Sequence, residues 1–208
     1  MGKIIAVANQ KGGVGKTTTQ VNLSACVAAA GRRVLSVDMD PQANATSGLG
    51  LLAEEGKSLY DVLVRGVDAK SCLLKTPVDT LTLLPADIRL AAAEVELVGR
   101  QEREYVLRQA LQSLRDAYDY LFIDCPPSLG LLTINALCAA DRVLVPIQCE
   151  YYALEGVGQL MNTVKRVQNG LNPKLDVEGV VLTMLDGRTN LGLQVVQEVK
   201  KHFKAKVY

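Results

Sequence analysis

The strongest constraint on the fold of this chain is a glycine-rich loop between a predicted strand and a predicted helix. The loop spans residues 10–18 and reads Gln-Lys-Gly-Gly-Val-Gly-Lys-Thr-Thr; the apolar run 4–8 precedes it and a segment with helical spacing follows it. Glycines have no Cβ, so consecutive backbone N–H groups of such a loop can turn inward on a polyphosphate. The N-terminus of the following helix also favours anions. The pattern therefore predicts a phosphate-binding loop in an α/β domain.

Most positions of this loop have a predicted task at a bound nucleoside triphosphate. The side chain of Lys16 would meet the β and γ phosphates, and the hydroxyl of Thr17 would bind the accompanying Mg²⁺. Gln10 stands where the usual G-x-x-x-x-G-K-[ST] pattern has its first glycine. A glycine turn that binds nothing is the alternative. The complete predicted nucleotide-binding set is Lys11, Gly12, Gly13, Val14, Gly15, Lys16, Thr17 and Thr18.

Acidic residues at the ends of two predicted strands are candidates for the metal and for the attacking water. Asp124 closes a continuous apolar run, and Asp38 and Asp40 follow an earlier strand, at the sheet edge where α/β proteins place their chemistry. We expect Asp124 to hold Mg²⁺ opposite Thr17. Asp40 would orient or deprotonate the water that attacks phosphorus, and Asp38 would tune the hydration of the metal. An N-cap or a solvated loop carboxylate is the alternative for each acid.

The order of the predicted elements indicates a doubly wound, mainly parallel α/β sheet with helices on both faces, a three-layer P-loop NTPase arrangement. Strands and helices alternate along one domain, 1–208, and no hairpin dipeptide separates neighbouring strands. Residues 206–208 look like the start of a further strand, so we expect the C-terminal strand and helix portion of the natural protein to be missing. The predicted strands are 4–8, 33–37, 80–84, 120–124, 142–147 and 177–184, and the predicted helices are 15–31, 58–64, 88–98, 102–114, 131–140, 153–168 and 191–203.

The second lysine of the loop makes the pattern more specific. Lys11 gives the form K-G-G-x-G-K-[ST], and on these residues the chain resembles the ParA/MinD group of P-loop ATPases, whose loop is called a deviant Walker A. Four further stretches look like the chromosomal ParA proteins, those of the Soj type in particular, so that the similarity covers essentially the whole chain. They are Val-Asp-Met-Asp-Pro-Gln at 37–42, Asn-Ala-Thr-Ser-Gly at 44–48, Asp-Cys-Pro-Pro-Ser at 124–128 and Glu-Tyr-Tyr-Ala-Leu-Glu-Gly at 150–156.

The resemblance implies an activity, a cofactor and partners. It implies slow, partner-stimulated hydrolysis of ATP to ADP and phosphate with Mg²⁺, in chromosome or plasmid partitioning. It implies an ATP-dependent homodimer in which Lys11 reaches across the two-fold interface to the nucleotide of the other subunit. Lys11, Lys16 and Asp40 then form the expected catalytic set, and a solvated surface lysine is the alternative for Lys11. The resemblance also implies nonspecific DNA binding, stimulation by the N-terminal arm of a ParB protein of the Spo0J type, and no membrane partner.

The overall charge neither requires nor excludes nucleic acid, because 23 basic residues stand against 22 acidic ones. A DNA contact must therefore come from a local patch. Arg188 resembles a DNA-contacting arginine of the family. Lys200, Lys201 and Lys204 would extend the patch, although a solvated helix face is the favoured interpretation of these lysines. In the family, an adenine-contacting turn and further basic residues follow the position of Tyr208.

Cysteine and histidine usage gives no sign of a metal centre or a disulfide framework. The five cysteines are scattered without a C-x-x-C pair, and His202 is the one histidine. This usage fits a reduced cytoplasmic compartment, and the resemblance implies association with the nucleoid. The first strand begins too soon for a signal peptide, and no apolar run has the length of a membrane span.

Four other hypotheses share parts of this pattern. A MinD-like, membrane-associated regulator of the division site would need a terminal amphipathic helix. An iron–sulfur reductase would need cluster cysteines, for which Cys125 and Cys149 are a poor match. An ATP-dependent ligase of the dethiobiotin synthetase kind would need a small-molecule pocket. A DNA-binding scaffold would use its nucleotide for structure alone.

Overall fold

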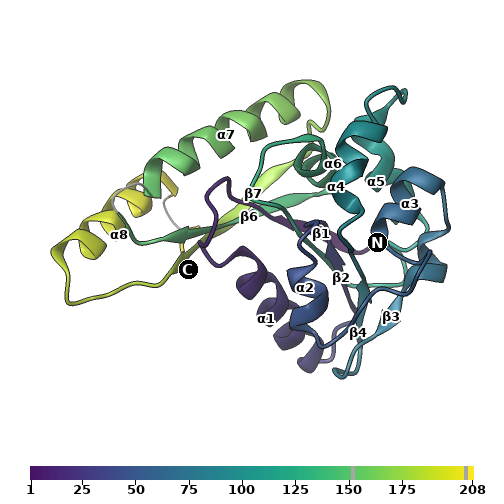
Figure 1. The fold of residues 1–208 in the computed structure, drawn as a ribbon. Helices are drawn as coiled ribbons and strands as arrows, with labels where there is room; N and C mark the ends of the chain where they lie inside the picture. The colour runs from purple at the N-terminus through teal and green to yellow at the C-terminus, as the bar shows by residue number, and fades with distance from the viewer. Residues whose placement is uncertain (151–152, 204–205) are drawn as a thin grey trace.

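The computed structural model describes residues 1–150, 153–203 and 206–208 of the chain. They form a single α/β domain on a seven-stranded sheet with the order β3-β4-β2-β5-β1-β6-β7 (Figure 1). Neighbouring strands are parallel except for β3 and β4, so the predicted mainly parallel fold is confirmed. The strands are β1 Lys3–Val7, β2 Val34–Asp38, β3 Leu74–Lys75, β4 Leu81–Leu84, β5 Tyr120–Asp124, β6 Arg142–Gln148 and β7 Asp176–Thr183.

Both faces of the central strands are apolar and buried. In β1, Ile4 and Ala6 belong to one hydrophobic cluster, whereas Ile5 and Val7 belong to another. The two sets separate because successive side chains of a strand point to opposite faces. Strands covered on both sides read as continuous apolar runs, which is why Tyr120–Asp124 could be recognised from the sequence with its observed bounds.

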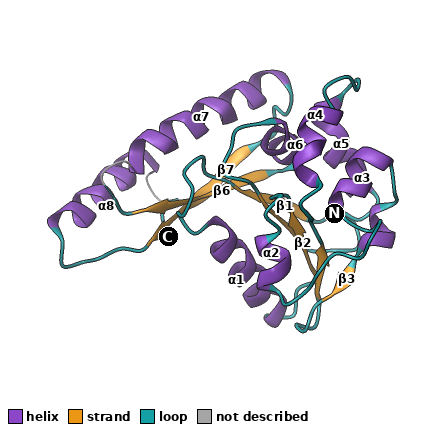
Figure 2. Cartoon of the chain, in the orientation of Figure 1, coloured by secondary structure: helices purple, strands orange, loops and turns teal. Residues whose placement is uncertain are grey.

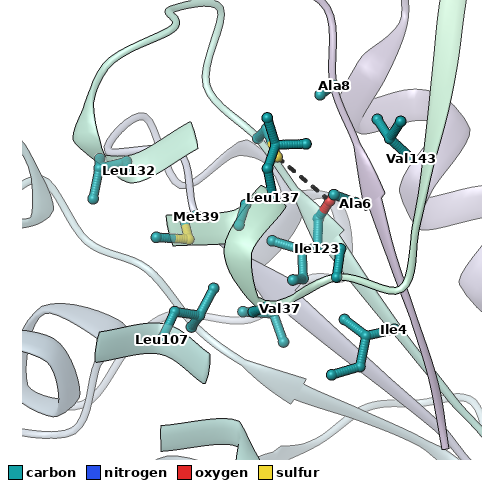
Figure 3. Close-up of a cluster of buried hydrophobic side chains, with 14 of the residues drawn as sticks. Ile4, Ala6, Ala8, Val37, Met39, Leu107, Ile123, Leu132, Leu137 and Val143 are labelled. Atoms are coloured by element: carbon teal, nitrogen blue, oxygen red, sulfur yellow. Dashed lines mark hydrogen bonds between the residues drawn. The ribbon is translucent and has the colours of Figure 1, made fainter. Parts of the chain in front are cut away.

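Helices cover both faces of the sheet, as the sequence predicts (Figure 2). α1 packs on the face of the smaller cluster, which holds Ile5 and Phe122. The larger cluster gathers side chains from α3 to α8 on the other face, and Figure 3 shows Leu107 and Leu137 facing Ile123 within it. The helices are α1 Lys16–Ala29, α2 Asn44–Gly48, α3 Leu59–Arg65, α4 Leu90–Glu96, α5 Val106–Gln112, α6 Leu131–Ala139, α7 Ala153–Gly170 and α8 Asn190–Phe203, with the 3₁₀ helices η1 Ala69–Cys72 and η2 Arg103–Tyr105.

Two of the differences from the sequence-based prediction have a clear physical reason. β3 was not predicted, because two residues are too few to show a periodic pattern. The single helix predicted over 102–114 is divided into η2 and α5. The buried side chain of Asn135 lies at this break, where it accepts a hydrogen bond from the Leu107 N–H at 3.1 Å and donates to the Arg103 carbonyl at 2.8 Å. A residue of α6 thus satisfies backbone groups that a continuous helix would have paired internally.

The last described residues pair with β7 through an isolated bridge, at the position where the sequence predicts strand-like residues. Val207 makes a parallel bridge to Val180, and the Tyr208 N–H donates to the Val180 carbonyl at 2.8 Å. Among the described residues, no helix combines the length and the apolar character needed to span a bilayer.

Candidate nucleotide-binding site

The predicted phosphate loop connects β1 to α1 and is anchored at its start by Asn9. The Asn9 Nδ2 group donates to the Pro146 carbonyl in β6 at 2.7 Å, and its Oδ1 accepts from the Lys11 N–H at 3.1 Å. Gly13 and Gly15 have φ values of +73° and +85°, in the left-handed region that L side chains rarely adopt. The backbone of the loop therefore requires glycine at both positions.

The N-terminus of α1 is open toward an anion. The helix begins directly after Gly15, with no side-chain cap and no acidic residue in its first turn. The first N–H groups of a helix have no intrahelical acceptor and carry the positive end of the helix dipole. This end of α1 is therefore suited to bind phosphate oxygens together with the loop.

Lys16 is a buried cation within the loop. Its side chain is only 7% exposed, and its Nζ donates to the carbonyl oxygen of Lys11 at 3.1 Å. Burial lowers the pKa of the Lys16 ammonium, whereas the carboxylates of Asp124 and Asp40 oppose this shift. An ammonium group has three donors, so this single backbone acceptor leaves capacity for phosphate oxygens.

Asp124 ends β5 next to Asp38, its register partner in β2. The Asp124 side chain is fully buried, and neither carboxylate oxygen has a hydrogen-bond partner among the described residues. Burial raises the pKa of Asp124 to about 7, and the charges of Asp38 and Asp40 act in the same direction. The Thr17 hydroxyl opposes the shift but makes no hydrogen bond of normal length to this carboxylate. Buried polar groups are nearly always paired, so Asp124 is fit to receive a cation.

Thr17 and Asp124 suit Mg²⁺ in the way that nucleotide-binding proteins hold it. In the part of the chain that the structure describes, no group of three or more acidic, histidine or cysteine side chains could hold a metal ion by itself. Mg²⁺ commonly keeps several waters and uses one or two protein oxygens together with substrate phosphates. The unsatisfied Asp124 carboxylate supplies such an oxygen.

Asp38 is satisfied by hydrogen bonds, in contrast to Asp124. Its Oδ2 accepts from the N–H and the hydroxyl of Thr46 at 2.8 and 2.7 Å, and its Oδ1 accepts from the Asp40 N–H at 3.2 Å. Burial raises the pKa of Asp38, and the bonds from Thr46 counteract that shift. These contacts position the segment after β2, and the action of Asp38 on metal hydration stays a prediction.

Asp40 opens a tight turn at the end of β2. Its Oδ1 accepts from the Gln42 N–H at 2.9 Å, and its carbonyl oxygen accepts from the Ala43 N–H at 2.9 Å. Because the charges of Asp40 and Asp124 both raise the pKa of Lys16, these three predicted site residues share one neighbourhood. The role of Asp40 toward water stays a prediction.

Lys11 is held by a carboxylate of the same chain. Its Nζ lies 2.8 Å from Oε2 of Glu150, which follows β6, and Gln148 also donates to Glu150. The predicted contact of Lys11 with the nucleotide of another subunit requires this ion pair to open, and it stays a prediction. The sequence pattern gave Glu150 no role, because a partner 139 residues away leaves no trace in local spacing.

Thr183, the last residue of β7, also supports the loop and was missed by the sequence analysis. Its hydroxyl donates to the Val14 carbonyl at 2.8 Å. Its methyl carbon lies 3.6 Å from the position that a Cβ on Gly15 would occupy. β7 thus contacts the loop from the far side of β6, and no motif in the sequence indicates it.

The predicted DNA-contacting residues lie on the surface. The Arg188 side chain is 90% exposed and pairs with Asp186 at 2.8 Å. Lys200 and Lys201 are exposed on α8, which agrees with a solvated helix face. The role of Arg188 in DNA binding stays a prediction. Three residues of the predicted motifs and patch lie outside the described residues: Tyr151, Tyr152 and Lys204.

Comparison with known proteins gives matches over nearly the whole chain. A family model described as an AAA domain matches residues 2–177. The sporulation initiation inhibitor protein Soj of Bacillus subtilis (strain 168) is 61% identical over 209 residues, which cover 100% of this chain and 83% of that protein. The chromosome partitioning protein ParA of Myxococcus xanthus (strain DK1622) is 54% identical over 209 residues, which cover 100% of this chain and 74% of that protein.

A solved structure shares the fold and contains a nucleotide. The crystal structure of cobyrinic acid a,c-diamide synthase from Mycobacterium smegmatis, with bound ADP and magnesium, matches with a TM-score of 0.91 and 45% identity. The match covers 98% of this chain and 83% of that one. The two ligands of that structure are of the classes expected at the loop and at Asp124.

Proposed function

This chain belongs to the ParA/Soj family of chromosome-partitioning ATPases. We propose that it dimerises when it binds ATP, that the dimer binds DNA, and that ParB stimulates hydrolysis of the ATP and so ends the dimeric state. The observation that carries the nucleotide part of this proposal is the fully buried carboxylate of Asp124 near Lys16, which has no hydrogen-bond partner among the described residues. Without a bound cation beside it, the ionised Asp124 carboxylate would be a buried charge with no compensating partner. A Mg²⁺-bound nucleotide on the loop would supply a cation for Asp124 and an anion for Lys16.

ATP would bind on the loop and the N-terminus of α1. The backbone N–H groups of 12–17 and the Lys16 ammonium would neutralise the phosphate oxygens. Thr17 and Asp124 would hold Mg²⁺, which when bound neutralises the charge that develops on the transferred phosphoryl group. Lys16 needs no large movement for this task, because it is already buried within the loop.

Asp40 would orient the attacking water. In-line attack on phosphorus depends on a positioned nucleophile, and the position of Asp40 depends on the turn that Gln42 and Ala43 close. Slow basal turnover is expected if this turn is seldom in the hydrolytic geometry. A partner that changes the turn would then raise the rate.

Lys11 would couple hydrolysis to pairing of two subunits. The ion pair between Lys11 and Glu150 joins side chains that are 34% and 51% exposed, and exposed pairs contribute only about 0–1 kcal/mol. Breaking it is therefore a small cost when the nucleotide of a second subunit offers several phosphate oxygens. A Lys11→Ala variant is expected to bind ATP and to remain a monomer.

DNA binding would use both subunits of the pair. Each would contribute Arg188 on the loop before α8, and affinity from such phosphate contacts falls steeply with salt. The proposed location is accordingly the cytoplasm, on the nucleoid. The alternative of a MinD-like regulator predicts binding to lipid instead.

Steady-state ATP turnover with and without DNA and the N-terminal arm of the cognate ParB tests the proposal. We expect slow basal turnover that rises when both partners are present. An Asp40→Ala variant is expected to bind ATP and to accumulate as a dimer on DNA. A monomer that hydrolyses ATP at the full rate with neither partner would refute the proposal, and a protein insensitive to ParB that moves to lipid vesicles would favour the MinD-like function.

The solved relative with bound ADP is named for an amide-forming reaction, which makes a synthase the second candidate. The relatives named for sporulation control and partitioning are 61% and 54% identical, compared with 45% for the synthase. Partitioning is therefore the function proposed here. ATP turnover that depends on an ammonia donor and a carboxylate substrate would favour the synthase.

A further inference from the structure

Every polar group of Lys11 has a partner within its own chain. Its N–H donates to Oδ1 of Asn9 at 3.1 Å, and its carbonyl oxygen accepts from Nζ of Lys16 at 3.1 Å. Its Nζ donates to Oε2 of Glu150 at 2.8 Å. The lysine that contacts the nucleotide of a second subunit in the proposed function is therefore held at three points by its own subunit.

Glu150 is itself positioned by the end of β6. The Gln148 side chain donates to Oε1 of Glu150, whereas Lys11 donates to Oε2. Both carboxylate oxygens thus have a donor, which fixes the orientation of the group. The Pro146 carbonyl of the same strand accepts from the Asn9 side chain at 2.7 Å. The backbone and the side chain of Lys11 are therefore both held from the end of β6, which neighbours β1 in the sheet.

The ion pair between Lys11 and Glu150 is the contact that a competing anion can open. The two side chains are 34% and 51% exposed, so they are accessible to a second subunit while the loop stays folded. A lysine side chain is flexible, and its ammonium group binds anions as a point charge. A triphosphate carries more negative charge than one carboxylate, so its oxygens compete with Glu150 for Lys11. Pairing of two subunits then exchanges one anionic partner of Lys11 for another.

We propose that Glu150 is an autoinhibitory counterion, which holds Lys11 within the unpaired subunit and so raises the protein concentration at which ATP-bound subunits pair. Each dimer that forms opens two of these ion pairs, one in each subunit. Each Glu150 carboxylate also loses its cation in the exchange. This inference rests on the proposed function, because the pairing that Glu150 opposes is the pairing of two ATP-bound subunits.

A Glu150→Gln variant and a matched control test the inference. The substitution removes the charge and keeps nearly the same side-chain volume. Glu54→Gln is the control, because Glu54 makes an exposed ion pair with Lys57, at 2.7 Å, in the segment before α3. The dissociation constant of the dimer is measured by analytical ultracentrifugation with Mg²⁺ and a nonhydrolysable ATP analogue. We expect Glu150→Gln to lower this constant at least roughly threefold, since two exposed ion pairs no longer have to open, and Glu54→Gln to leave it unchanged.

A double variant, Lys11→Ala with Glu150→Gln, shows whether Glu150 acts through Lys11. It is expected to remain a monomer with the ATP analogue, as Lys11→Ala does. Dimerisation of the double variant would show that Glu150 opposes pairing without Lys11, and this would overturn the inference. Damage to the fold does not explain the expected gain in Glu150→Gln, because it would weaken ATP-dependent pairing rather than strengthen it.

The outcomes separate this inference from the proposed function. A dimer dissociation constant of Glu150→Gln that equals or exceeds that of the wild type overturns the inference and leaves the proposed function standing. A wild type that stays monomeric with the ATP analogue at every concentration overturns both. Equal tightening in Glu54→Gln would attribute the effect to the net charge of the chain, which also overturns the inference.

Discussion

Replacement of Asp124 by asparagine is expected to raise the free energy of unfolding of the ligand-free protein, and to raise it more at high pH than at low pH. The Asp124 carboxylate is fully buried and has no hydrogen-bond partner among the described residues. Its pKa is about 7, compared with an ordinary value of 3.8. Asparagine has a similar volume and no charge to bury, so it should titrate nothing at this position.

The sign and size of the effect follow from proton linkage. A carboxyl group with a raised folded-state pKa binds protons more tightly when the protein is folded. It therefore lowers the free energy of unfolding by an amount that grows as the pH rises from about 4, the pKa in the unfolded chain, to about 7, the pKa in the folded protein. Above about pH 7 this loss of stability stays constant. With the pKa of Asp124 at about 7, the cost is about 2 kcal/mol at pH 5.5 and about 4 kcal/mol at pH 8. The free energy of unfolding of Asp124→Asn minus that of the wild type should rise by about 2 kcal/mol across this interval.

Urea unfolding at pH 5.5 and pH 8, with chelator and without nucleotide, measures this difference. Asp116→Asn is the control. The Asp116 side chain is 86% exposed, and its ion pair with the N-terminal ammonium, at 3.7 Å, is exposed as well, so the replacement should give a difference that changes little with pH. Mg²⁺ and ATP should reverse the order, since a ligand stabilises most the protein that binds it best. Parallel pH profiles for Asp124→Asn and the wild type would refute the reasoning that this carboxylate is buried without compensation.

Other substitutions test the loop and the acids individually. Lys16→Ala should weaken ATP binding roughly tenfold or more in calorimetry, because a charged hydrogen-bond donor is lost; unchanged affinity would place the phosphates elsewhere. Gly15→Ala should cost about 1–2 kcal/mol of stability because of its left-handed backbone, whereas Gly12→Ala, with nothing within 4 Å of the added Cβ, is the control. Thr46→Val should lower the free energy of unfolding by about 1–3 kcal/mol, because the buried Asp38 carboxylate loses the hydrogen bond from the Thr46 hydroxyl. Equal urea midpoints would show that this bond is dispensable.

Much of the fold could be predicted because it depends on local patterns. A continuous apolar run closed by an acid identified β5, and the glycine spacing identified the loop before α1. The division of the helix predicted over 102–114 could not be predicted, because Asn135 of another helix satisfies the backbone groups at the break. β3 was missed because an edge strand of two residues depends on its neighbour for pairing.

The sequence by itself determined where the phosphate loop lies and which strand ends carry acids, since both are properties of residues close together in the chain. Only the tertiary structure decided which hydrogen-bond partners those acids have. Asp38 and Asp124 occupy equivalent positions in neighbouring strands, yet Asp38 accepts two hydrogen bonds from Thr46 and Asp124 accepts none from the described residues. The reason is that a buried carboxylate takes its partners from whichever segments the fold packs around it, and no spacing along the chain records that choice.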